Sequence, residues 1–404
     1  MQAPVLPLSA YRADLAQSRG RVRLTQSDDD LIALGTLLSR CQQVRRHEGG
    51  ADVALRLRRN CVAVSQRILL REARIVPSSS EADSCDAPGA VAIIREVADV
   101  AEDGEALRIA DALLVLAFKE WGAEAGKLEQ GRLLAQRARI ARKRGDRESA
   151  DAMYDEVRLW GGGLSELRAR ADVGQAMLAR ERGNLPAMRR LFARALEHAQ
   201  SAGSGEVVAK AHHGLMLAAA ASGQFGEAVL HAWAAFREVE GARVREGEAL
   251  LNVAQAVLEL GHPATALHTF VAALSRSLPK RLELPALGGA AQAAAAIGET
   301  GLLYRLVARA RLLVVDDLGY DAVAAIAEVA TALATVGDLS AGSWRVAALD
   351  AAKKSGFHEI VFRLENADVK TVDESSPVPE SDMLRQVLDD VNSLDDWDAL
   401  MVTI

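Results

Sequence analysis

The sequence predicts an all-α fold, a right-handed superhelical solenoid of antiparallel helix pairs. The first observation is a repeat in which a glycine is followed by a polar residue. It occurs six times, at spacings of 38, 40, 38, 37 and 39 residues, at Gly145, Gly183, Gly223, Gly261, Gly298 and Gly337. Periods of this length are typical of stacked helix pairs. The second observation is composition: alanine dominates long stretches, aromatic residues make up 4% of the chain, and the alternation that strands require is nearly absent.

The bulk composition indicates a protein that folds in water. Half of the 404 residues are apolar and a quarter are charged. No charge-free apolar run reaches the roughly 18 residues of a membrane helix, and the first residues lack the pattern of a secretory signal. The three cysteines, Cys41, Cys61 and Cys85, are too few and too irregular for a disulfide framework or a paired-cysteine zinc site. We therefore expect a cytoplasmic protein with no membrane contact, no bound metal and no cofactor.

Charge is distributed unevenly along the chain. Residues 1–200 carry 32 basic and 28 acidic side chains, whereas residues 201–404 carry 16 and 27. The first half is therefore net positive and the second strongly negative. Such an asymmetry bears on the choice of partner rather than on the fold.

The N-terminal quarter predicts three segments. Residues 1–24 form an arm that contains Pro and Arg, and residues 25–76 predict an N-terminal helical pair divided at Gly49-Gly50. Ser27, followed by three Asp residues, is a helix-start pattern, because acidic side chains favour the positive end of a helix. Residues 77–90 are rich in Pro, Ser and Asp. They predict an exposed loop that leads into the main helical array of residues 91–365.

Within the array each repeated glycine marks the end of the first helix of a pair. Seven positions before the glycine stand residues that are almost all alanine: Ala138, Ala176, Met216, Ala254, Ala291 and Ala330. Nine positions after it stand Tyr154, Phe192, Ala232, Phe270, Val307 and Val346. Small side chains at a fixed position let two helices cross closely, and larger ones fill the next gap along the same face.

These repeats resemble the tetratricopeptide repeat (TPR) family, in the long-repeat variety found in bacterial signal-responsive regulators and scaffolds. The resemblance covers residues 128–355, where RGDRESADAMYDEV and LGHPATALHTFVAAL look like the turn and second helix of that repeat. The family's usual period is about 34 residues, and a HEAT-like array of about 40 to 47 residues per repeat is the structural alternative. The resemblance implies a non-catalytic scaffold or adaptor that binds a protein or peptide segment on its concave face.

The concave-face residues follow from the same resemblance, because the first helix of each pair lines that face in the family. Carried onto this chain, the inward positions are Arg132, Arg139, Arg142, Lys143, Arg170, Arg180, Lys210, His213, Asn252 and Gln255. Further along the array the face consists of small, largely uncharged residues. A groove that is basic at one end and narrow at the other suits a segment with an acidic portion and an apolar helical portion.

The C-terminal segment predicts a separate acidic amphipathic helix. Residues 366–380 form a Pro- and Ser-containing flexible linker, and residues 381–404 follow. Apolar residues recur there every three or four positions, at Leu384, Leu388, Val391, Leu394, Trp397 and Met401, among several Asp residues. Three roles stay open for this docking helix: capping the last repeats, folding back in cis onto the basic end of the groove as a tethered competitor, or binding a partner in trans.

The sequence contains no recognised catalytic or nucleotide-binding motif, so no enzyme activity is assigned. One alternative to the scaffold remains. Residues 40–74 carry nine Arg against three acidic residues, and an Arg-rich N-terminal region is also typical of a transcriptional regulator that contacts nucleic acid. The sequence therefore favours a cytoplasmic protein-binding scaffold with a regulatory or sensory role. It identifies neither the partner nor the oligomeric state.

Overall fold

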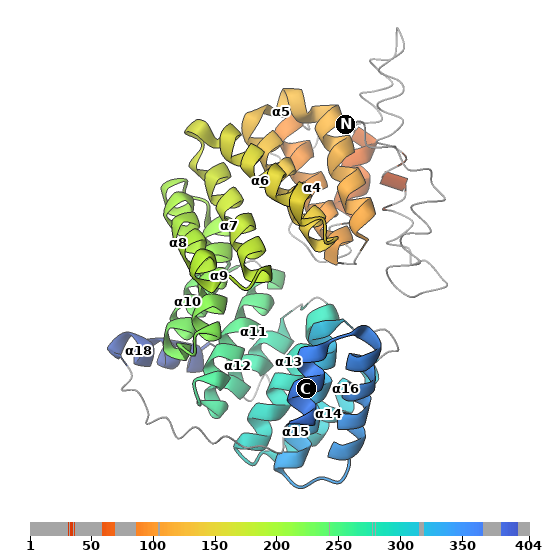
Figure 1. Cartoon of the computed structure of the whole chain (residues 1–404), viewed down its shortest axis with the longest axis vertical. Coiled ribbons are helices and arrows are strands. Elements are labelled where there is room, and N and C mark those ends of the chain that lie inside the picture. The colour runs from red at the N-terminus through yellow and green to blue at the C-terminus, as the bar shows by residue number, and fades with distance from the viewer. Residues whose placement is uncertain are drawn as a thin grey trace. The chain divides into compact units, whose positions relative to one another are not determined.

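The computed structural model shows two compact units, Met1–Gly214 and Leu215–Ile404 (Figure 1). The described residues are 31, 33–34, 36, 59–68, 86–103, 106–241, 243–276, 278, 280–314, 319–366 and 381–394. Among these residues there are helices and turns but no β-strand. The predicted arm, most of the N-terminal pair, the loop up to residue 85, the linker from residue 367 and the tail from residue 395 lie outside the described residues.

Unit 1 is a run of consecutive helices. They are α4 (Ala87–Asp103), α5 (Leu107–Lys143), α6 (Arg147–Trp160), the 3-10 turn η1 (Gly161–Gly163), α7 (Ser165–Glu181), α8 (Leu185–Ser201) and the first part of α9 (Gly205–Ala221). Helix α5 is two helices joined at Gly126, whose φ of 83° and ψ of 172° are not helical. Residues 59–68 are helical too, and Cys61 and Ile68 join the core that α4 and α5 form.

Unit 2 continues the same pattern. It contains the rest of α9, then α10 (Phe225–Arg237), α11 (Arg243–Glu259), α12 (Pro263–Ser275), α13 (Lys280–Ala296), α14 (Thr300–Leu313), α15 (Tyr320–Thr335), α16 (Ala341–Ser355), α17 (His358–Glu365) and α18 (Asp382–Asn392). One apolar core extends from Met216 to Val391. No helix among the residues that the structure describes is both long and apolar enough to cross a membrane.

The helices form pairs, in which we call the first member the A helix and the second the B helix. The A helices are α4, the part of α5 after Gly126, α7, α9, α11, α13 and α15; the B helices are the part of α5 before Gly126, α6, α8, α10, α12, α14 and α16. The two helices of a pair pack on each other, as α7 packs on α8 and α13 on α14, and A helices also contact the next A helix, as α5 contacts α7 and α13 contacts α15. The predicted all-α solenoid of helix pairs is confirmed.

The repeated glycines end the A helices as predicted. All six have a left-handed φ, between 70° and 95°, a conformation that glycine adopts without steric cost. At the first of these turns, the Gly145 N–H donates to the Arg142 carbonyl at 2.9 Å and the Asp146 N–H donates to the Ala141 carbonyl at 3.0 Å. The polar residue after the glycine can then cap the B helix: the Asp146 side chain accepts from the Ser149 N–H. This explains why the repeat reads as glycine followed by a polar residue.

Aromatic side chains of B helices insert against glycines of the following A helices. A Cβ added to Gly174 would lie 2.0 Å from Tyr154 Cζ, and one added to Gly289 would lie 2.3 Å from Phe270 Cζ. Phe192 and Gly214 form a third such pair, at 2.2 Å. Each aromatic stands nine residues after a turn glycine, and each partner glycine stands nine residues before the next one. These contacts fix the spacing of neighbouring pairs, because no larger residue fits beneath the ring.

Candidate functional site

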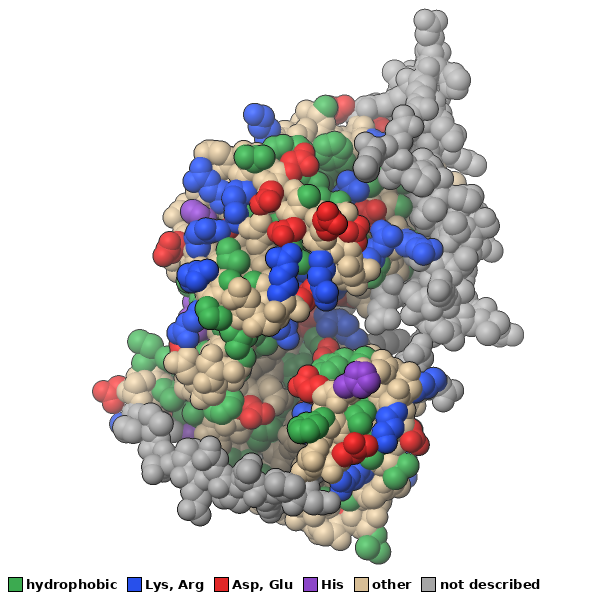
Figure 2. Space-filling view, in the orientation of Figure 1, with side chains coloured by type: hydrophobic (Ala, Val, Ile, Leu, Met, Phe, Trp, Pro, Cys, Tyr) green, Lys and Arg blue, Asp and Glu red, His purple; other side chains and the backbone are tan. Residues whose placement is uncertain are grey.

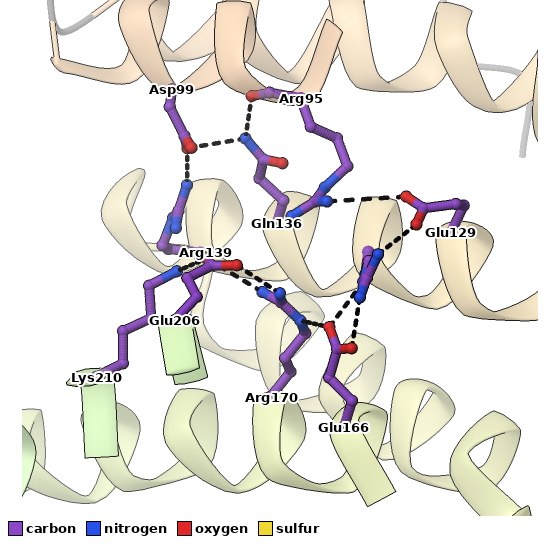
Figure 3. A network of polar contacts seen from close by, with 10 residues as sticks. Arg95, Asp99, Glu129, Gln136, Arg139, Glu166, Arg170, Glu206 and Lys210 are labelled. Atoms are coloured by element: carbon purple, nitrogen blue, oxygen red, sulfur yellow. Dashed lines mark hydrogen bonds and ion pairs between the residues drawn. The ribbon is translucent and has the colours of Figure 1, made fainter. Parts of the chain in front are cut away.

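The A helices of unit 1 are joined by a row of alternating charges, which we call the charge ladder (Figure 3). Its seven members, in order, are Arg95, Glu129, Arg132, Glu166, Arg170, Glu206 and Lys210. They come from α4, α5, α7 and α9, so that each step either crosses to the next A helix or stays within one helical turn. The ladder links four consecutive A helices through side chains alone.

The central member of the ladder is Glu166. Its Oε1 accepts from Arg132 Nε at 2.7 Å and from Arg170 Nε at 2.8 Å. Arg170 in turn donates from Nη2 to Glu206 Oε2 at 2.7 Å, and only 9% of the Arg170 side chain is exposed. Bonds between ionised partners are stronger than neutral ones, and partial burial limits their screening by salt. The ladder therefore holds α5, α7 and α9 in a fixed register.

A second group of contacts joins α4 to the C-terminal half of α5. Arg139 pairs with Asp99 and with Glu102, and Lys143 Nζ lies 2.7 Å from Glu102 Oε1. The Glu102 side chain is 4% exposed and contacts both of these basic residues. Gln136 donates to Asp99 Oδ1 at 2.9 Å and adds an uncharged link between the same helices.

Two carboxylates of the ladder, Glu166 and Glu206, have the lowered pKa expected of a carboxylate in an ion pair. Burial alone would raise the pKa of Glu206, but Lys210 and Arg170 outweigh it and hold that pKa well below its usual value. Burial likewise opposes the ionised form of Glu166, yet hydrogen bonds and charge from Arg132 and Arg170 lower its pKa. Burial lowers the pKa of Lys210, against the effect of Glu206. Glu166 and Glu206 are therefore ionised at neutral pH.

Two atoms of the ladder and one atom beside it lack a hydrogen-bond partner in the part of the chain that is described. They are Arg95 Nε, Glu129 Oε2 and Gln136 Oε1, all buried. Glu129 Oε2 still lies 3.8 Å from Arg95 Nη1, which is an ion pair rather than a hydrogen bond. A buried unpaired atom costs free energy, so this end of the ladder is less well satisfied than its centre.

The predicted concave-face residues fall into three groups. Six of them are engaged in ion pairs within unit 1: Arg132, Arg139, Arg142, Lys143, Arg170 and Lys210. Arg180 is exposed on α7, and His213 is half-buried on α9. Burial, together with the charge of Arg180, lowers the pKa of His213 to about 4, so this imidazole is neutral at pH 7. The last two, Asn252 and Gln255, are partly buried on α11 in unit 2.

The basic surface predicted from the sequence is thus largely neutralised by acidic neighbours. Over unit 1, the space-filling view shows Lys and Arg side chains beside Asp and Glu side chains (Figure 2). The partners were recognisable in part, because Glu166 and Glu206 each precede a basic ladder member by four residues. The contacts between helices, such as Arg132 with Glu166, depend on how one pair stacks on the next. Partner binding by these residues stays a prediction.

Glu328 is a partly buried acidic side chain on the A helix α15 of unit 2. Glu328 on α15 lies over Gly288 of α13, where an added Cβ would be 2.7 Å from Glu328 Oε2. Burial raises the pKa of Glu328 to about 7; Glu259 and Asp321 add to the rise, and Arg363 opposes it. Glycine at position 288 therefore makes room for a carboxyl group that is poorly solvated and half protonated near neutral pH.

The second candidate surface is the groove that α18 occupies, which we call the tail groove. Helix α18 packs against α10 and α12, two neighbouring B helices of unit 2 (Figure 1). Its predicted apolar residues Leu384, Leu388 and Val391 are buried, and Leu394 is partly buried. Val387, which the sequence pattern did not single out, is buried with them. Trp397 and Met401 lie outside the described residues. Within the described chain, α18 is therefore docked in cis on B helices two and three pairs before the last.

Comparisons with known proteins do not assign the chain to a family. No family model matches it, and no curated protein matches its sequence. Among solved structures, it is similar to the crystal structure of BtubC (BKLC) from P. vanneervenii, with 14% sequence identity and a TM-score of 0.36. That match covers 57% of this chain and 85% of the other chain. A likeness of this degree identifies neither the family nor the function. Among the residues that the structure describes, no three His, Cys, Asp or Glu side chains are grouped as a metal ion requires.

Proposed function

We propose that this chain is a non-catalytic protein-binding scaffold, acting as a cytoplasmic adaptor or regulatory module. One observation carries the proposal: the array holds an amphipathic helix, α18, across two of its B helices. That helix buries four aliphatic side chains and keeps its polar side chains toward solvent. Docking of an amphipathic helix in a groove between helices is a general mode of peptide recognition. A surface that accepts one such segment is physically suited to accept another.

The long-repeat TPR assignment belongs to the same proposal. It is supported by turn glycines spaced 37 to 40 residues apart, all with left-handed φ, and by close packing of aromatic side chains on glycines between successive pairs. Stacked pairs of this kind expose an extended surface along the A helices. Partner segments would bind there as well as in grooves between B helices.

The experiment that tests the scaffold function is quantitative capture. Tagged full-length protein is incubated with extract of its source cells, and the retained proteins are identified by mass spectrometry and then purified. We expect at least one of them to bind the pure scaffold with a Kd below about 10 µM, the range of specific protein complexes. The proposal is refuted if the folded protein retains nothing beyond what a scrambled helical array retains.

A single substitution tests whether the A-helix face contributes. Arg180 is exposed and lies outside the charge ladder, so Arg180→Glu should leave thermal stability unchanged. If the face binds an acidic segment, this variant weakens capture by roughly tenfold, the effect of losing one partly desolvated ion pair. Arg189→Glu, on the B helix α8, is a control of the same type on the other helix of the pair. Equal effects of both substitutions would show that general charge, not the A-helix face, governs binding.

A further inference from the structure

Helix α18 meets the tail groove with an apolar stripe. The buried residues Leu384, Val387, Leu388 and Val391 stand at positions i, i+3, i+4 and i+7, which places them on one stripe of the helix. The polar contacts of Ser381, Gln386 and Ser393 stay within the segment: the Ser381 hydroxyl caps the helix at the Leu384 N–H, Gln386 donates to Asp390, and Ser393 donates to the Asp390 carbonyl. An aliphatic stripe of this kind selects for the spacing and volume of apolar side chains.

Helix α18 is also short. It has 11 residues, whereas isolated helices below about 12–15 residues are marginal in water. Its helical order therefore depends on the free energy of docking, so leaving the groove and unfolding are one event. In sequence, 14 residues separate Asn366 of the last repeat from Ser381. Even fully extended, such a connection spans at most about 50 Å, so the released helix would stay tethered within that distance of Asn366.

Gly226 lies in the groove beneath α18, so a substitution there can test whether a helix binds in the groove. Gly226, the second residue of α10, would place a Cβ 3.3 Å from Leu384 Cδ2. Gly301 is the second residue of α14 and stands at the same distance after its turn glycine, yet a Cβ there would meet nothing within 4 Å. Neither glycine has a left-handed φ. A larger side chain at position 226 therefore obstructs the groove, and the same change at position 301 is a matched control.

We propose that the tail groove is a docking site for an amphipathic helix of another protein, and that α18 is a tethered competitor which that helix must displace. The partner helix carries aliphatic side chains at i, i+3, i+4 and i+7 and polar residues elsewhere, as α18 does. This inference rests on the proposed scaffold function and names one surface and one class of ligand for it. Binding of the partner releases α18, with its acidic face and the tail beyond it.

The test uses full-length protein and a fluorescent peptide of residues 381–394. In one variant, Leu384→Asp with Leu388→Asp releases the tail by placing two charges in the apolar seat. We expect the peptide to bind this released variant. A tethered competitor has an effective concentration of about 1 mM, so a peptide whose intrinsic Kd is about 10 µM should bind the wild-type chain about 100-fold more weakly. A peptide with the same two Asp substitutions should not bind either protein.

The glycine pair locates the site. In the released variant, Gly226→Val should weaken peptide binding at least tenfold, and Gly301→Val should change it less than twofold. Peptide binding that is equal in the wild-type and released chains, or lost equally with both glycine variants, would overturn the proposal. So would aggregation of the released variant, which would make α18 a structural cap.

Two further measurements separate the remaining outcomes. In the wild-type protein, the α18 amides should exchange their hydrogens faster than the α11 amides, and added peptide should accelerate the exchange in α18 further. If the α18 amides exchange only when the whole protein unfolds, the partner does not displace α18. Dimers that form through α18 at micromolar concentration, seen by light scattering, would assign the groove to a second copy and refute a foreign partner. If the peptide does not bind the released variant but the protein still captures partners, the proposed scaffold function stands and only the assignment of the tail groove as a docking site is refuted.

Discussion

Removing the charge of Glu166 should destabilise unit 1 without changing its helical repeat. Glu166→Gln keeps the size of the side chain, yet it leaves Arg132 and Arg170 without the carboxylate that both of them share. The Arg170 side chain is 9% exposed, and breaking a buried pair by removing one partner costs about 3–5 kcal/mol. Arg170 retains Glu206, and the new amide oxygen can still accept one bond, so we expect a loss of about 2–4 kcal/mol.

Thermal unfolding followed by circular dichroism measures this loss. A cooperative unit of about 200 residues shifts its Tm by about 2–4 °C per kcal/mol, so Glu166→Gln should lower the Tm of unit 1 by roughly 4–16 °C at pH 7. Glu197→Gln on the exposed side of α8 is the control and should move the Tm by less than about 2 °C, as surface substitutions do. If Glu166→Gln behaves like Glu197→Gln, the ladder does not stabilise the stack of A helices, and the argument from its burial is wrong.

Two other substitutions test the packing and the titration. Gly174→Ala should destabilise unit 1 by about 1–3 kcal/mol or more, because the added Cβ would lie 2.0 Å from Tyr154 Cζ. Gly342→Ala is the control: its Cβ would meet nothing within 4 Å, so this variant should be neutral or slightly stabilising in the same thermal unfolding assay. Glu328 has a pKa raised to about 7 by burial, so the folded state binds its proton more tightly than the unfolded state and stability falls as pH rises from about 4.5 to 7. Glu328→Gln should therefore raise the free energy of unfolding by about 1–3 kcal/mol at pH 8 and leave it nearly unchanged at pH 4. If the variant and the wild-type protein show the same dependence of the unfolding free energy on pH, this carboxyl group is solvated.

The helix-pair fold could be predicted from the sequence because its determinants are local. A turn glycine with left-handed φ and the polar cap after it are fixed by the backbone needs of two adjacent helix ends, so they recur wherever those ends recur. The aromatic residues nine positions after the turn glycines were visible too. Their partners, such as Gly174 beneath Tyr154, were not recognised, because a glycine inside a helix has no periodic signal of its own. It becomes meaningful only when the next pair is stacked against it.

The candidate sites were less predictable, for a reason that differs between the two surfaces. On the A helices, the basic residues were selected one at a time. Their positive charge is neutralised by acidic partners about 34 to 40 positions away, such as Glu166 for Arg132 and Asp99 for Arg139. In the tail, amphipathicity predicted a docking helix and three of its four buried residues. Amphipathicity did not predict which helices α18 packs against, because four aliphatic side chains fit many apolar grooves of similar width.

The two surfaces lead to different expectations about regulation. Charge pairs of the ladder lie between A helices that are also joined by packing, so salt and pH should change the stability of unit 1 gradually and in proportion to the number of pairs affected. The buried stripe of α18 is aliphatic and the helix is marginal alone, so occupancy of the tail groove should respond weakly to salt and steeply to a competing helix. Peptide binding to the released variant should therefore change less than twofold between 50 and 500 mM NaCl. A strong salt dependence would mean that the Asp residues of α18 take part in recognition, and the partner would then have to be acidic as well as amphipathic.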